Sequence, residues 1–320
     1  MAKKQEISAH EAASHLKELK ALFELLAKND VNKGDSGFSA DKEAILKVFE
    51  HTKNETKEDI LVRLTLIDSM YSTQMSRRYY ALDELADFLA KLSEGKQGKL
   101  RQMFLDFAKD PDNNLSLFNS TFKERNEKGE LIEVEKNLFS EAYGIGKDGK
   151  DKGVAISLIS KYAYFETDFQ FPIYDSIACE MHPLVWHFCG FGKAKPELLV
   201  KNGTNVDGKK TMVAYVKAIN LLIDKLDCKG LKYDLLDRVL WFVGKIRRGN
   251  LSLVLTREEY QETMTLYPPQ EITKVSRGKE KTITEYFNVE NVDLAKLEYL
   301  KTNKILKAFF ELAKFYGHKK

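Results

Sequence analysis

Residues 143–176 read YGIGKDGKDKGVAISLISKYAYFETDFQFPIYDS and decide how the rest of the chain is interpreted. The stretch opens on a glycine-rich loop and continues into an apolar segment that we expect to be a helix at about 154–166. It ends in Phe171–Ser176, where Pro172 predicts a short extended piece because the residue before a proline avoids the helical region. A further helix is expected to begin at Asp175 or the serine after it, since both side chains are good helix caps.

Elsewhere in the chain, apolar residues recur at the spacing of one helical face, which predicts a mostly helical protein. Ser8 and Glu11 stand at capping-box spacing before the first such segment. The charged residues 123–137 are interpreted as an exposed loop or a frayed helix. Helices are expected at 8–28, 42–51, 57–71, 75–92, 209–227, 231–247 and 293–316, and a small hairpin at 271–275 with 281–287, turning at 276–278.

The predicted fold class is therefore all-α, or nearly so, with one small β-hairpin near the C-terminus. The chain has 320 residues, enough for one large domain or two modest ones with a buried core. We expect three parts: an N-terminal helical extension at 1–55, a helical core at 56–260, and a C-terminal hairpin and helix at 261–320.

The charges of the chain nearly cancel, because 51 Lys and Arg face 48 Asp and Glu and leave a formal net charge of +3. Such a balance does not by itself indicate a nucleic-acid partner, so any DNA-binding surface must come from local clusters of basic residues. One cluster is Lys245, Arg247 and Arg248, and another is Lys274, Arg277, Lys279 and Lys281.

Three cysteines and no CxxC pair favour a reducing compartment over a disulfide scaffold. The N-terminal residues carry no apolar signal core and no apolar run is long enough to span a bilayer, so we expect a cytoplasmic protein without membrane contact. Cys179, His182, His187 and Cys189 lie close together and raise the alternative of a zinc site. Their spacing matches no common zinc module, and buried thiols with packed imidazoles are the preferred interpretation, with no metal.

The glycine-rich loop has the features of a phosphate-binding turn. A helix N-terminus offers unpaired amides and partial positive charge, and glycines let a phosphate approach the backbone. Lys147, Lys150 and Lys152 add positive charge there. An ordinary turn between two helices is the alternative.

Two further segments carry polar side chains at helix ends. Asp175 at a helix N-terminus would stay ionised, because the helix dipole and backbone donors favour the anion, although by itself the segment favours a simple capping aspartate. Ser72, Thr73 and Gln74 follow a predicted helix and could reach into a duplex or cap helix ends. The tyrosines at 79–80 are candidates for the core.

Taken together, these three segments resemble the helix-hairpin-helix DNA glycosylase superfamily, in particular its 8-oxoguanine glycosylase-like branch. The resemblance covers about 57–250 and implies a two-lobed helical fold that needs no cofactor. In that family a Ser/Gln/Asn-rich loop probes the duplex, and here Ser72 and Gln74 match it. A Gly-x-Gly hairpin holds a DNA phosphate, and Gly144 and Gly146 are similar to it. The Val/Ile-Pro-x-Asp segment with the catalytic aspartate looks like the segment that ends in Asp175.

The chain departs from the family pattern at the nucleophilic lysine of the bifunctional members. The hairpin carries the extra residues 147–152, and the position expected for that lysine holds Ala155. Lys152, at the helix start, and Lys161, two turns further in, are the remaining candidates. Lys161 edges the apolar stripe of its helix, where a snorkelling side chain is the alternative.

The resemblance implies a monomeric enzyme that flips a modified base out of double-stranded DNA and cleaves its N-glycosidic bond with the help of Asp175. A lysine nucleophile would add strand cleavage through an imine, whereas water would leave an abasic site. Candidates for stacking on the base, each of which could instead be core, are Tyr164, Phe165, Phe169 and Trp241. The competing interpretations are a non-catalytic helical module that binds nucleic acid or protein, a phage-defence N-glycosidase acting on modified DNA or nucleotides, and an unrelated helical structural protein.

Overall fold

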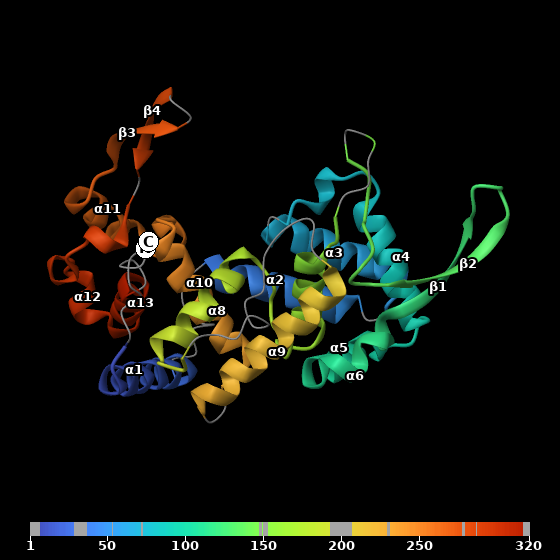
Figure 1. Ribbon diagram of the computed structural model, residues 1–320, viewed down its shortest axis with the longest axis horizontal. Helices are drawn as coiled ribbons and strands as arrows, with labels where there is room; N and C mark the ends of the chain where they lie inside the picture. The colour runs from blue at the N-terminus through green and yellow to red at the C-terminus, as the bar shows by residue number, and fades with distance from the viewer. Residues whose placement is uncertain are drawn as a thin grey trace. The chain divides into compact units, whose positions relative to one another are not determined.

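The computed structural model contains helices and two separate two-stranded antiparallel sheets, which confirms the mostly helical fold class (Figure 1). It describes residues 7–28, 37–52, 54–71, 73–146, 149, 153–192, 207–228, 231–276, 279–285 and 287–315, with the backbone alone at 37–41, 271–276 and 279–285. None of the described helices is long and apolar enough to cross a membrane.

The chain divides into two compact units, and their boundaries differ from the three consecutive parts expected at 1–55, 56–260 and 261–320. Unit 1 consists of 1–37, 180–193 and 235–320, and unit 2 of 38–179 and 194–234. The N-terminal helix belongs with the C-terminal residues because α1 (Ala9–Lys28) packs its apolar face against α13 (Lys304–Phe315). Such long-range packing has no signature in the local sequence.

Unit 2 holds most of the helices that surround α7 (Ile156–Glu166). Nine of the eleven residues of α7 are buried, so neighbours cover it on every side. A cluster of phenylalanine rings at Phe104, Phe107, Phe118, Phe139 and Phe171 forms part of this core. The other elements of this unit are α2 (Gly37–His51), α3 (Lys57–Tyr71), η2 (Met75–Arg77), α4 (Ala81–Ser93), α5 (Lys99–Lys109), α6 (Pro111–Asn114), η3 (Leu115–Phe118), β1 (Asn119–Arg125), β2 (Leu131–Asn137) and α9 (Gly208–Leu226), with the first residues of α8 (Ser176–Phe188) and α10 (Tyr233–Arg247).

The expectation of a loop or frayed helix at 123–137 is wrong, because β1 and β2 pair there as an antiparallel hairpin that extends beyond α4 in Figure 1. Phe122 lies opposite Val134 in the register, and the Phe122 ring packs on Phe88 of α4 at 4.8 Å between centroids. Gly129 supplies the positive φ that the turn needs. Only one face of the hairpin is partly covered, so few positions call for an apolar side chain. The alternation of apolar and polar residues that marks a strand is therefore weak, and the many charged residues hide it.

Unit 1 confirms the predicted C-terminal hairpin, formed by β3 (Gln270–Ser276) and β4 (Lys279–Glu285). The single helix expected at 293–316 is instead broken into short pieces before α13. Asn303 ends one piece and caps the next, since its side chain accepts a hydrogen bond from the Leu306 amide at 3.0 Å. The remaining elements are η5 (Leu251–Leu253), α11 (Arg257–Leu266), η6 (Val289–Asn291), η7 (Leu294–Lys296) and α12 (Tyr299–Thr302).

The last turn of α7 carries a buried ion pair. Glu166 Oε2 accepts a hydrogen bond from Arg63 Nη1 of α3 at 2.7 Å, and Arg63 also donates to the Tyr162 hydroxyl at 3.3 Å. Burial raises the pKa of Glu166 to about 7, although the Arg63 guanidinium opposes the shift. The folded protein therefore binds a proton at Glu166 more tightly than the unfolded chain does.

This shift predicts a pH-dependent stability that Glu166→Gln removes. The unfolded chain releases the proton near pH 4.5 and the folded protein near pH 7, so the stabilisation present below pH 4.5 is lost as pH rises through that window. Between pH 4 and pH 8 the stability of the Gln variant relative to the native protein should therefore rise by up to about 3 kcal/mol. Urea unfolding across this range measures it, with the exposed Glu133→Gln as control. A difference that does not change with pH contradicts the assignment.

Candidate functional site

The extended segment Phe171–Ser176 is held against α7 by Ser160. The Ser160 hydroxyl accepts a hydrogen bond from the Tyr174 amide at 2.9 Å and lies 3.3 Å from the Tyr174 carbonyl oxygen. The Tyr215 hydroxyl of α9 donates to the carbonyl of Ile173. Because these bonds fix the backbone on both sides, the position of the following residue, Asp175, is fixed as well.

Asp175 caps α8, as the capping alternative expects. Its Oδ1 accepts a hydrogen bond from the Ala178 amide at 2.8 Å, and the Cys179 amide donates to its main-chain carbonyl at 3.0 Å. Capping uses Oδ1 and leaves Oδ2 directed at another group. The side chain keeps 25% of its exposure, so the carboxylate remains accessible from solvent.

The group that faces Asp175 is Lys161, whose Nζ lies 4.0 Å from Asp175 Oδ2. The ammonium also donates to Ser157 Oγ, one turn earlier on α7, at 2.9 Å. It lies 5.8 Å from the ring centroid of Tyr71, at the end of α3. The Lys161 side chain is only 5% exposed, so the snorkelling interpretation of this lysine is wrong.

This arrangement joins a buried amine, a partly exposed carboxylate and a hydroxyl within unit 2. At 4.0 Å the two groups form an ion pair, and a nucleophilic amine would form only if Asp175 moved within hydrogen-bond reach and accepted a proton from the ammonium. The neighbouring thiol of Cys179 does not compete, because burial and then the charge of Asp175 raise its pKa to about 12. The chemistry of the site therefore centres on Lys161 and Asp175.

The single helix expected at 75–92 is interrupted, because the structure has the short helix η2 followed by α4. The loop that follows α3 leads into η2 and is fixed by Asp68. Asp68 is buried and accepts hydrogen bonds from the Thr73 hydroxyl, from the Met75 amide at 2.8 Å and from the Ser76 amide at 2.9 Å. Burial raises the pKa of Asp68, but these hydrogen bonds outweigh it and hold the pKa below its usual value. Gln74, the expected duplex probe, is exposed on this loop with φ of +62°. Ser72 lies outside the described residues.

The Gly144-Ile145-Gly146 segment supports this loop in a way that differs from the expected phosphate hairpin. The amides and carbonyls of Ile145 and Tyr79 exchange two hydrogen bonds of 3.0 Å. The Gly144 amide donates to Glu84 Oε2 at 2.7 Å, so a carboxylate of α4 occupies the position expected for a phosphate. The Gly146 carbonyl accepts from the Gly149 amide at 2.9 Å. Lys147, Lys150 and Lys152 lie outside the described residues.

The expected base pocket is not open at two of its residues. Tyr164 and Phe165 are fully buried in unit 2, where the Tyr164 hydroxyl donates to Asp234 and accepts from Lys42. They form core because α7 is covered on every face, which the one-sided helical pattern did not reveal. Trp241 is partly exposed on α10, with Lys245 Nζ 5.4 Å from its ring centroid.

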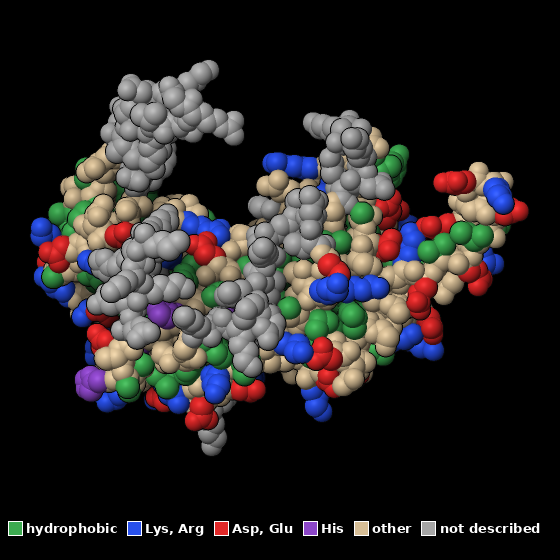
Figure 2. Space-filling model, viewed as in Figure 1, with side chains coloured by type: hydrophobic (Ala, Val, Ile, Leu, Met, Phe, Trp, Pro, Cys, Tyr) green, Lys and Arg blue, Asp and Glu red, His purple; other side chains and the backbone are tan. Residues whose placement is uncertain are grey.

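The expected basic cluster near the end of α10 is partly neutralised within unit 1. Arg248 Nη2 lies 2.8 Å from Glu180 Oε2, and Arg247 Nε lies 3.8 Å from Oε1 of the same carboxylate. The side chains of the second cluster, at 274–281, lie outside the described residues. Figure 2 shows acidic and basic side chains interleaved along β1–β2 on the face in view, without a band of one sign.

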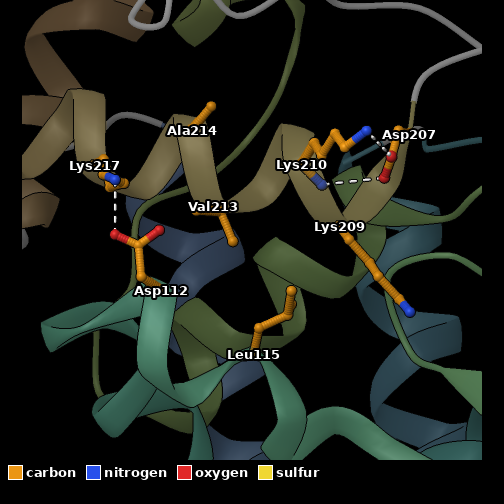
Figure 3. Close-up of a pocket in the computed structure, with 8 residues that line it drawn as sticks. All are labelled: Asp112, Leu115, Asp207, Lys209, Lys210, Val213, Ala214 and Lys217. Atoms are coloured by element: carbon orange, nitrogen blue, oxygen red, sulfur yellow. Dashed lines mark hydrogen bonds and ion pairs between the residues drawn. The ribbon is translucent and has the colours of Figure 1, made fainter.

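A groove of about 470 Å³ in unit 2 was not predicted (Figure 3). Leu115, Val213 and Ala214 give it apolar walls, and lysines of α9 stand at its rim. Lys210 pairs with Asp207 at 3.4 Å and Lys217 with Asp112 at 2.7 Å, so two of its three lysines are already matched by carboxylates. No local motif marks this groove, because two segments about 100 residues apart form it.

Comparison with known proteins gives no relative: no protein-family model, curated protein or solved structure matches the chain. In the part of the chain that the structure describes, no three His, Cys, Asp or Glu side chains are grouped to hold a metal ion. Cys179 and Cys189, considered above as zinc ligands, are buried.

Gly144 packs closely against Tyr79 and Ala81, so Gly144→Ala should lower the free energy of unfolding by a large amount. A Cβ built there meets Ala81 Cβ at 2.5 Å and the Tyr79 carbonyl oxygen at 2.8 Å, with φ of +77°. Gly98 has a similar φ of +78°, but a Cβ built there meets nothing within 4 Å. Gly98→Ala therefore measures the loss of stability from the positive φ alone, without a steric clash. We expect losses of about 1 kcal/mol for Gly98→Ala and about 3 kcal/mol for Gly144→Ala in urea unfolding. Equal losses would show that this packing is unimportant.

Proposed function

We propose that the protein is a DNA glycosylase-like enzyme that cleaves the N-glycosidic bond of a modified or damaged base, with Lys161 as nucleophile and Asp175 as the assisting carboxylate. The observation that carries the proposal is the 4.0 Å approach of the buried Lys161 amine to a partly exposed Asp175. The order of segments supports it too: a polar loop, a glycine-containing turn, a helix and a proline segment that ends in an aspartate follow one another as in the family that the sequence resembles, although two residues separate Pro172 from Asp175 where the family has one.

In the proposed reaction the target base leaves the duplex stack and its sugar approaches the Lys161 amine. Asp175 takes the proton from the Lys161 ammonium, and the amine lone pair forms a bond to C1′ of the sugar. The bond between C1′ and the base nitrogen breaks, its electron pair departs with the base, and the base takes up the proton that Asp175 accepted. The C1′–O4′ bond then breaks, the nitrogen lone pair forms the C=N bond of the imine, and the proton that the nitrogen loses passes to O4′; the DNA strand can be cut from this imine.

The other groups would act on the DNA. Gln74, which is exposed, would contact the duplex beside the extruded base, and Arg77, exposed on the same loop, would contact a phosphate. Ser72, Lys147, Lys150, Gly146 and the cluster Lys245, Arg247 and Arg248 remain proposed DNA contacts. Affinity that rests on such phosphate contacts falls steeply as salt rises.

Borohydride trapping tests the nucleophile. Reduction of an imine during reaction with a damaged oligonucleotide should link protein and DNA covalently. Lys161→Met should abolish this adduct, whereas Lys152→Ala, which removes the other candidate amine, should keep it. Release of base without any adduct would contradict lysine attack and favour water. Oligonucleotides carrying different lesions and modified bases, heated in alkali to cut abasic sites, identify the substrate.

Asp175→Asn separates chemistry from structure. Asn caps helices as well as Asp does, so α8 should keep its cap and the thermal midpoint should stay within a few degrees. The variant cannot accept the proton, so the rate of base release should fall by at least about 100-fold while DNA affinity stays unchanged. A rate equal to that of the native protein would remove Asp175 from the mechanism.

A non-catalytic module that binds nucleic acid or protein is the second candidate, and one observation favours it. The Gly144 amide, expected to hold a phosphate, already donates to Glu84. If the aspartate is dispensable and no oligonucleotide loses a base, this candidate replaces the first.

A further inference from the structure

Two neighbouring tyrosines, Tyr79 and Tyr80, stand in the break between η2 and α4 with 59% and 70% of their surface exposed. The sequence made them candidates for the core, and that expectation is wrong. Their backbone, not their side chains, makes the structural contacts: Tyr79 pairs with Ile145, and the Tyr80 carbonyl accepts the Glu84 amide at 2.9 Å.

A tyrosine at position 80 stabilises the start of α4 less than other residues would. It is the N-cap of α4, where Ser, Thr, Asp or Asn would supply a side-chain hydrogen bond, and it makes none. Its φ of +63° is a left-handed conformation that disfavours any residue with a Cβ. An exposed side chain offers no packing in return. Breaks of local sequence rules without a structural gain concentrate at functional sites.

The support beneath the tyrosines is rigid. Asp68 ties down the loop before them through three donors, and the buried Met75 anchors it in the core. On the other side, Gly144 packs so closely that a Cβ would overlap Ala81. A rigid support lowers the entropy lost when a planar partner binds.

The surroundings favour an anionic partner with aromatic groups. The Arg77 guanidinium donates to Gln74 Oε1 at 3.1 Å and makes no ion pair among the described residues. Of the acidic residues in the first turn of α4, Asp83 is paired with Lys57 at 3.0 Å, and Glu84 is directed at the Gly144 amide.

We propose that Tyr79 and Tyr80 form a stacking platform for unpaired nucleobases, so that the protein prefers single-stranded or unpaired DNA to continuous duplex. Bases within a duplex are covered on both faces by their neighbours, whereas an unpaired base offers an open face to an aromatic ring. The choice of DNA as partner rests on the proposed function, but the platform acts in binding and not in bond cleavage.

Binding of the full-length chain to a short fluorescent oligothymidylate tests the platform without any damaged base. Tyr79→Ala and Tyr80→Ala should each weaken binding about tenfold, and Tyr→Phe at either position should keep it, because stacking needs the ring and not the hydroxyl. Tyr260→Ala, which removes an exposed tyrosine of unit 1, is the matched control and should change nothing. Tyr80→Gly should weaken binding as much as Tyr80→Ala does. Because glycine adopts a positive φ without strain, weaker binding by this variant reflects the missing ring and not a misfolded loop.

A strand of the same length with every base removed separates stacking from phosphate contact. It should bind the native protein about tenfold more weakly than the oligothymidylate, and the Ala variants should not weaken it further. The stacking proposal is overturned if the native protein binds the two strands with equal affinity, or if the Ala variants bind as the native protein does. A protein partner would then be the remaining interpretation of the exposed tyrosines. Base release from damaged DNA is measured separately, so failure of the platform and failure of the glycosylase proposal are distinguishable.

Discussion

The approach of Lys161 to Asp175 is the constraint on which the candidate site depends. A buried ammonium loses several kcal/mol of hydration, and a carboxylate at 4.0 Å recovers only part of it. Neither charge is required by the fold, because an asparagine would cap α8 and an apolar side chain would fill the place of Lys161 on α7. A charged pair at a place where neutral groups would suffice is the feature that supports the proposed chemistry.

The other buried ion pairs of unit 2 show why this one differs. Lys42 and Asp234 meet at 2.5 Å with 4% and 14% of their side chains exposed, and Arg63 and Glu166 at 2.7 Å with 3% and 10%. Both pairs are tight and closed, as expected of structural contacts. The pair at Asp175 is looser, and its carboxylate is more exposed to solvent than the carboxylates of the other two pairs. Distance and exposure together single out the reactive candidate.

Much of this site could be predicted from the sequence, since local chemistry determines it. Pro172 and the capping residues after it mark the start of α8, and helical periodicity marks α3, α7, α9 and α10. What the sequence missed depends on partners far along the chain. The burial of Tyr164 follows from packing on all sides of α7, and the occupied amide of Gly144 follows from Glu84, which lies 60 residues away. The strands β1 and β2 were missed because their exposed face is densely charged.

One helical turn connects the reactive pair to the loop that displays the tyrosines. The last residues of α3 include Tyr71, which lies over the Lys161 ammonium, and Asp68, which fixes the loop after the helix through its hydrogen bonds. Because Asp68 and Tyr71 are three residues apart, a shift of that turn moves both together. A base held at the loop and a sugar held at the lysine would therefore be positioned by the same rigid element. Under the proposed function, this coupling would account for the positive φ of Gln74 and Tyr80, which their own packing does not repay.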